Sequence, residues 1–533
     1  MKRRNSIYYM LPVFLVILAG IAVRFYGIRF GLPYKWADDA KIFYFSNIML
    51  YKGDPIPDYF MYSSISMYIQ SLVMLSLGWV SKLLVSMGLA GHTVSSIAAT
   101  FLTKETMNYQ LSTEFAYYSV LIGKGVFTLF NVMSGYFVYK ILKRCTGSSA
   151  ISLAGLLMNA FLFLQYQYSL VLRQESLSLF FLAAMAYLTI RLYDSPGRKK
   201  AILLGAVSAL CATTEYSLAI LLIIPVVVYG IARKRPEGPL AITPFEKRYR
   251  LRQVVLLCVA ALVCYCALVV YIAGNSRETL LYFLSIKYRL AAMVGGAALA
   301  IAAVIIAIYK IFIQRSAIAG RISTALVKKG CIPYYFLYGF IPVAVIFNLG
   351  LFVKFYHYGY QVFIYLLGAY TKSFRIYTID LKSMLNVVRS YIFNEQMGPV
   401  YTVLALLSVL VLFNKRIEPA KRRAMGIIFS FVALMFFFLI FFIKMFYTHR
   451  FIAISSLQVC IVALSLYNIY LYFREKNRLA ALLVTGILIA GGIYPHARGI
   501  ARLASLTREP DTRTLAYKWL GERIESEETV AID

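Results

Sequence analysis

Two adjacent carboxylates, Asp38 and Asp39, are the first candidates for acid–base chemistry in this sequence. They follow the apolar run 8–26 by about a dozen residues, so they would lie beside the bilayer if that run crosses it. A carboxylate in such a partly dry setting becomes a better base and can take a proton from an attacking hydroxyl. The pair could also hold a divalent metal ion, or it could be two solvated acids near a helix start.

Three basic residues, Lys124, Arg173 and Arg450, are candidates to bind a phosphate. Each stands near the end of an apolar run, where a charge is costly unless it has a partner. Each also has a simpler interpretation. Arg173 can form an ion pair with Glu175 in a short turn that faces water. Lys124 can extend to the membrane interface, and Arg450 can anchor lipid headgroups.

Glu175 and Glu215 are two further acids at turns between apolar runs. Glu175 would orient the phosphate-binding cation or an acceptor, and Glu215 is either an active-site acid or a solvated turn residue. The four His residues are not paired at metal-ligand spacing. The sequence also lacks a P-loop, a nucleophile elbow and a dinucleotide-binding glycine pattern, so the acids and bases carry the functional argument.

Long apolar runs must position these residues, because they recur along the whole 533-residue chain, which is 61% hydrophobic. Backbone groups in hydrocarbon must bond within their own segment, so such runs form helices. The runs do not alternate as the strands of a membrane barrel do. The fold class is therefore all-α and polytopic, with about thirteen transmembrane helices. They are expected near residues 8–26, 120–138, 151–171, 176–192, 201–214, 217–231, 254–273, 291–312, 333–353, 400–413, 425–446, 452–472 and 480–493.

The charge distribution predicts the orientation of these helices. The formal net charge is +32, and Lys and Arg cluster in short loops between apolar runs, which is typical of topology signals. This placement indicates membrane lipids rather than nucleic acid as partners. If the basic loops are cytoplasmic, the N-terminus lies inside and the C-terminus outside. The protein would then reside in the plasma (inner) membrane.

One apolar stretch, residues 64–89, could either cross the membrane or lie on its outer surface. If it crossed, every later basic cluster would face outward. The stretch also contains several Ser residues, Gln70 and Lys82, which suit an interfacial helix better than a spanning one. We therefore expect a long first extracytoplasmic loop, residues 28–114, that contains interfacial helices.

These assignments divide the chain into a transmembrane domain, residues 1–497, and a short extracytoplasmic tail, residues 498–533. The first outer loop, 28–114, would hold the catalytic acid. A second large outer loop is expected at 354–399.

The order of several motifs resembles the GT-C superfamily of polyprenyl-phosphate-dependent glycosyltransferases, in particular the protein O-mannosyltransferase-like and lipid A aminoarabinose-transferase-like groups. Two positions differ from the usual pattern: Glu215 stands where Lys is common, and Asp39 where Glu is common. The motifs are Arg24-Phe25-Tyr26-Gly27, Gly31-Leu32-Pro33, Asp38-Asp39, Gly53-Asp54-Pro55, Gly123-Lys124, the turn from Tyr168 to Glu175, Gly205 to Tyr216, Tyr391 to Val400, His449-Arg450-Phe451, and Asp511-Thr512-Arg513.

The resemblance implies a membrane glycosyltransferase with its active site on the extracytoplasmic side. Its donor would be a polyprenyl-phosphate-linked sugar, and its acceptor a lipid, a glycan or a protein. Asp38 would be the base and Asp39 its support, while Lys124, Arg173 and Arg450 would bind the donor phosphate. Two alternatives are a flippase or transporter of lipid-linked sugars and a polymerase or ligase of surface polysaccharide. A transporter would carry charges deep within its spans.

Overall fold

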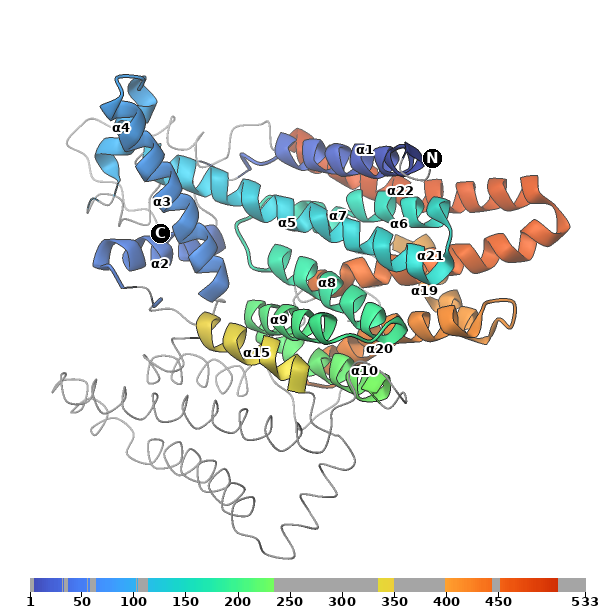
Figure 1. Ribbon diagram of the computed structural model, residues 1–533. Helices are drawn as coiled ribbons and strands as arrows, with labels where there is room; N and C mark the ends of the chain where they lie inside the picture. The colour runs from blue at the N-terminus through green and yellow to red at the C-terminus, as the bar shows by residue number, and fades with distance from the viewer. Residues whose placement is uncertain are drawn as a thin grey trace, which may run out of the picture.

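The computed structural model describes residues 4–30, 32, 37–54, 56–57, 64–101, 103, 114–233, 334–348, 398–442 and 451–506. Every regular element within these ranges is a helix, in agreement with the all-α class (Figure 1). The helices are α1 (Arg4–Tyr26), α2 (Ala37–Lys52), α3 (Ser64–Ser86), α4 (His92–Thr100), α5 (Glu114–Thr146), α6 (Ser149–Ala160), α7 (Phe163–Ser169), α8 (Glu175–Asp194), α9 (Arg198–Thr214), η2 (Tyr216–Leu222), α10 (Ile223–Arg233), α15 (Tyr334–Phe347), α19 (Gly398–Leu407), η4 (Ser408–Phe413), α20 (Pro419–Phe442), α21 (Ile452–Lys476) and α22 (Arg478–Leu506).

A helix lies at each predicted span that falls within the described residues, whereas the spans expected at 254–273 and 291–312 lie outside them. Five described helices are long and apolar enough to cross a membrane, or six if one bent pair is counted as a single span. Four more apolar segments are shorter, among them Met10–Tyr26 and Tyr334–Phe347. The number of thirteen spans and their orientation therefore stay predictions.

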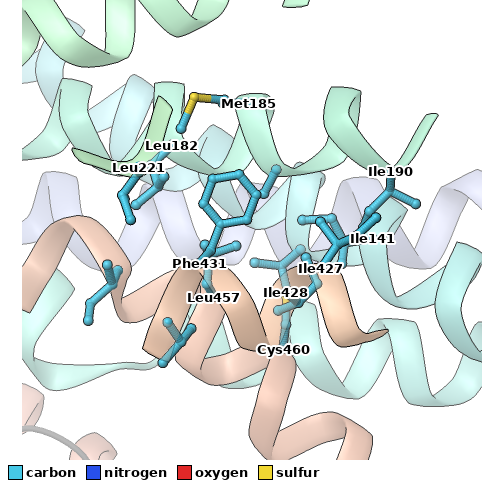
Figure 2. Packing of buried hydrophobic residues seen from close by; sticks show 14 of the residues in the cluster. Ile141, Leu182, Met185, Ile190, Leu221, Ile427, Ile428, Phe431, Leu457 and Cys460 are labelled. Atoms are coloured by element: carbon cyan, nitrogen blue, oxygen red, sulfur yellow. The ribbon is translucent and has the colours of Figure 1, made fainter. Parts of the chain in front are cut away.

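The bundle is held together by a large apolar core between α5, α8, η2, α20 and α21. Figure 2 shows the Phe431 ring of α20 directed toward Leu182 of α8 and Leu221 of η2. Ile428 and Cys460 fill the neighbouring layer from α20 and α21. All five side chains are buried within the protein, so this part of the bundle is packed by protein rather than by lipid.

One predicted span is broken. Where the sequence suggests a single segment over 151–171, the structure has α6 and α7, which meet at a bend of 50°. A break in an apolar helix frees backbone carbonyls that lipid cannot satisfy. Here a polar side chain from a neighbouring helix donates to such a carbonyl, that of Ala160 at the end of α6. This partner belongs to another apolar run, so the run 151–171 by itself gives no sign of the break.

The first predicted outer loop does contain helices, as expected. Figure 1 shows α2, α3 and α4 gathered at one end of the bundle, with α3 running across the direction of α1 and α5. The hydroxyl of Ser46 in α2 donates to the carbonyl of Met67 in α3 at 3.1 Å, and Gln70 of α3 donates to the carbonyl of Ser119 in α5 at 3.0 Å. By length and composition α3 could also cross a membrane, so its interfacial position stays a prediction.

Candidate functional site

The predicted basic clusters gather at one end of the bundle. Arg144, near the end of α5, forms an ion pair with Asp194, the last residue of α8. Arg423 of α20 donates to the hydroxyl of Tyr193 at 3.1 Å. Helices that begin and end far apart in sequence therefore place their basic residues together, which the positive-inside interpretation requires.

The candidate acids lie at the opposite end. α8 runs from Glu175 to Asp194, so Glu175 lies one full helix length away from the basic end. A short turn reverses the chain, and α9 packs against α8 and returns to end at Thr214. Glu215 follows immediately. The structure thus brings Glu175 and Glu215 to the same end of the bundle, which we call the site end.

Arg173 and Glu175 form a two-point ion pair in the turn before α8. Arg173 Nη2 lies 2.9 Å from Glu175 Oε1, and Arg173 Nε donates to Oε2 at 3.2 Å. The Glu175 side chain is only 3% exposed and that of Arg173 15%, so the pair is enclosed rather than facing water. The Arg173 guanidinium also lies 5.4 Å from the centre of the Tyr168 ring. The Glu175 carboxylate thus occupies the Nε and Nη2 edge of the guanidinium, and a guanidinium has a second edge, formed by its two Nη atoms, that suits phosphate or carboxylate.

Lys124 is buried in α5, and its ammonium donates to the carbonyl of Phe30 at 2.8 Å. This contact differs from the interfacial extension considered above, because the side chain is enclosed by protein. The neighbouring Gly123 faces both Gln70 of α3 and Leu172: a β-carbon there would clash with the Gln70 side-chain oxygen and lie 3.3 Å from Leu172 Cδ1. The surface of α5 beside Lys124 and the turn that carries Arg173 are therefore packed together.

Asp38 and Asp39 fall in the first turn of α2. The N-terminus of a helix carries a partial positive charge, which favours carboxylates. The helix α2 packs against α3 and α5, and Lys124 binds the chain at Phe30, a few residues before α2 begins. The catalytic acids predicted from the sequence are thus carried by an element that contacts the site-end helices.

Glu215 lies between α9 and η2, where one carboxylate oxygen accepts a hydrogen bond from the Ser217 hydroxyl at 2.7 Å. Arg450 lies outside the described residues. It precedes α21 by two positions in sequence. Within the part of the chain that the structure describes, no group of three or more His, Cys, Asp or Glu could hold a metal ion.

Arg24 is a buried cation that the sequence patterns do not single out as a site residue. Its guanidinium donates from Nε to Asn131 Oδ1 at 3.2 Å and from Nη1 to the carbonyls of Gly20 and Ala160 at 3.1 and 2.8 Å. A charge inside the apolar run of α1 is the signal that could have revealed it. The fold and these charges define an all-helical integral membrane protein with an enclosed ion pair at one end of its bundle.

The comparison with protein families leads to a narrower class. Residues 110–263 match the model of the dolichyl-phosphate-mannose-protein mannosyltransferase family. The matched segment contains Lys124, Arg173, Glu175 and Glu215. This family belongs to the GT-C superfamily, so the match confirms the resemblance indicated by the sequence motifs. No curated protein matches the chain.

The chain is similar to solved structures of an archaeal oligosaccharyltransferase from Archaeoglobus fulgidus. The first is AglB in complex with an inhibitory peptide and a dolichol-phosphate, with 10% identity, a TM-score of 0.46, and coverage of 98% of this chain and 59% of that one. The second is the apo form, with 13% identity, a TM-score of 0.43, and coverage of 96% and 58%. A form tethered to an acceptor peptide has 11% identity, a TM-score of 0.42, and coverage of 96% and 57%. This chain therefore spans less than two thirds of the length of these proteins.

Proposed function

We propose that this protein is a GT-C glycosyltransferase that moves a sugar from a polyprenyl-phosphate donor to an acceptor. The observation that carries the proposal is the enclosed Arg173–Glu175 pair, which lies within the family-matched segment and at the end of the bundle opposite the basic clusters. A partly buried guanidinium whose plane is fixed by a carboxylate on one edge is suited to bind a phosphate through its other edge.

The reaction would be an inverting displacement at the anomeric carbon. The acceptor hydroxyl oxygen forms a bond to that carbon while the bond from the carbon to the phosphate oxygen breaks. Asp38 takes the hydroxyl proton, Asp39 supports it, and the polyprenyl phosphate leaves. Arg173, Lys124 and Arg450 stabilise the negative charge on the leaving group.

The two remaining acids would orient the reactants. Glu175 fixes the plane of the Arg173 guanidinium through both carboxylate oxygens, which removes rotational freedom before the donor arrives. Glu215 would contact the acceptor from the end of α9. The acceptor would be a lipid, a glycan or a protein.

The site end would face the extracytoplasmic side of the plasma (inner) membrane. Two arguments support this orientation: the basic clusters lie at the other end of the bundle, and nucleotide sugars are confined to the cytoplasm. A lipid-linked donor supplies an activated sugar where no nucleotide sugar is present.

The experiment is transfer of labelled sugar from a panel of polyprenyl-phosphate donors, in membranes that contain the wild-type protein or the variant Asp38→Asn. We expect the variant to lose about 10²–10⁴-fold in rate, since Asn keeps the shape of Asp but not its basicity. Asp54→Asn is the control, because Asp54 is an acid of the same outer segment and its carboxylate accepts from the backbone of Ile56. Near-normal transfer by Asp38→Asn would contradict the assignment, and Glu175 would become the next candidate base.

The same assay addresses a divalent metal ion. If Asp38 and Asp39 jointly hold one, Asp39→Asn loses as much activity as Asp38→Asn, and a chelator abolishes wild-type transfer. If Asp39 only supports the base, its variant is milder and the chelator has no effect.

A further inference from the structure

A connected group of buried polar side chains crosses the interior of the bundle at the break between α6 and α7. Its members come from six helices and are all at most 1% exposed. We call it the polar cluster. It consists of Arg24 of α1, Thr128, Asn131 and Ser134 of α5, Asn159 of α6, Gln165 and Ser169 of α7, Ser176 of α8, and Ser455 and Ser456 of α21.

Hydrogen bonds join the α6, α7 and α21 members of the polar cluster. The Gln165 amide donates to Asn159 Oδ1 at 3.0 Å and to the Ser455 hydroxyl at 2.9 Å. The Ser456 hydroxyl donates to Asn159 Oδ1 at 2.8 Å. Burying so many polar groups is expensive unless they bond to one another or to the backbone. We therefore expect the cluster to supply hydrogen-bond partners that buried backbone groups need.

That need is visible at the break. Ala160 is the last residue of α6, and its carbonyl accepts from Arg24 Nη1 at 2.8 Å. The last carbonyls of a helix have no partner within the helix, and neither lipid nor an apolar core supplies one. A cation near a helix C-terminus is also favoured by the helix dipole. Arg24 therefore caps a helix whose sequence begins more than a hundred residues later.

Two side chains of α5 hold α7 in the same way, through its backbone. The Thr128 hydroxyl donates to the carbonyl of Ser169, the last residue of α7, at 2.8 Å. The Asn131 amide donates to the carbonyl of Gln165 at 3.3 Å. A helix of seven residues has little stability of its own, so these bonds from α5 fix its position.

The position of α7 in turn sets the Arg173–Glu175 pair. α7 carries Tyr168, whose ring lies 5.4 Å from the Arg173 guanidinium. Only a short turn separates Ser169 from Glu175, the first residue of α8. A shift of α7 would therefore move both the ring beneath the guanidinium and the chain that bears it.

We propose that Arg24, Thr128 and Asn131 are positioning residues: they bind the backbone carbonyls of α6 and α7 and so hold the Arg173–Glu175 pair in its two-point geometry. The identity of the anion that the Arg173 guanidinium binds rests on the proposed function. The positioning itself does not.

The first test separates the inter-helix bond from a general loss of packing. Thr128→Val removes one hydroxyl whose acceptor lies on another helix. Thr189→Val is a matched control, because Thr189 is also fully buried but donates within its own helix, to the carbonyl of Met185 at 2.7 Å. Both are made in the full chain in nanodiscs, and amide hydrogen exchange is followed over residues 163–175. We expect exchange there to rise about tenfold in Thr128→Val and not in Thr189→Val.

The second test asks whether the loss of the Thr128 bond changes ligand binding at Arg173. The probe is a labelled polyprenyl phosphate without sugar, and the measured quantity is its dissociation constant. Thr128→Val should raise it about five- to tenfold. In an Arg173→Met background the same change should add nothing, because residues that act through one another are not additive.

The outcomes are distinguishable. Unchanged exchange in Thr128→Val, or equal effects in both Thr variants, overturns the positioning role whatever the ligand. Additive effects of Thr128→Val and Arg173→Met on binding also overturn it. If exchange rises only in Thr128→Val while the wild-type protein binds no polyprenyl phosphate, positioning is supported and the proposed donor is wrong.

Discussion

The Lys124 ammonium donates to the carbonyl oxygen of Phe30 at 2.8 Å, so a buried residue of α5 holds the chain where it leaves α1. The next element is α2, which carries Asp38 and Asp39 in its first turn. One lysine therefore links the start of the first outer segment to the helix that packs against the Arg173 turn.

Lys124→Met should separate stability from function. Losing the bond to Phe30 costs about 1–3 kcal/mol, but removing a buried charge repays a comparable amount, so the free energy of unfolding should change by less than about 1 kcal/mol. Transfer should fall at least about tenfold, because the first outer segment loses its anchor and the phosphate loses a cation. Lys140→Met in the same helix at the basic end is the control. Normal transfer by Lys124→Met would show that neither role matters.

Variants of the Arg173–Glu175 pair can also separate an effect on stability from an effect on donor binding. Arg173→Met or Glu175→Leu alone should destabilise the fold by roughly 1–3 kcal/mol, because each leaves an enclosed charge without its two-point partner. The double variant should be more stable than either single one, since apolar side chains of similar volume can replace an enclosed ion pair. Thermal unfolding in detergent gives the stabilities, and the KM for the donor gives the function. A double variant with a normal donor KM would mean that the pair does not contribute to donor binding.

Packing of α9 against α15 gives a third prediction. A β-carbon at Gly205 would clash with the carbonyl of Phe336, and one at Gly339 would clash with the carbonyl of Ile202. Small residues let two helix backbones approach in this way. Gly205→Ala should therefore lower the free energy of unfolding by about 1–3 kcal/mol. Gly426→Ala should instead raise it slightly, because nothing lies within 4 Å of that position and Ala favours a helix.

The orientation of the bundle can be tested by labelling single cysteines with a membrane-impermeant maleimide after the native cysteines are replaced. A cysteine at Met87, beyond the end of α3 and well exposed, should react in intact cells. A cysteine at Glu418, whose side chain is 62% exposed near the basic end, should react only after permeabilisation. Labelling of Glu418 from outside would mean that α3 crosses the membrane and that the site end faces the cytoplasm.

The amino-acid sequence by itself determined where most helices lie. The predicted runs 176–192, 201–214 and 452–472 agree with α8, α9 and α21 to within a few residues. The reason is local: an apolar run must satisfy its own backbone hydrogen bonds, and a helix is the structure that does so. The pairing of Arg173 with Glu175 could also be predicted from the sequence, because both residues belong to one short turn.

Tertiary structure decided what the buried charges bind. Arg24 finds its carbonyl partner 136 residues away in Ala160, and Lys124 finds Phe30 at a separation of 94. No local pattern encodes such pairs, since the cost of a buried charge can be repaid by a partner on any neighbouring helix. The break between α6 and α7 was hidden for the same reason. Arg24 of α1 binds the Ala160 carbonyl at the break, and Thr128 and Asn131 of α5 bind the Ser169 and Gln165 carbonyls of α7, so these partners meet only when the helices pack together.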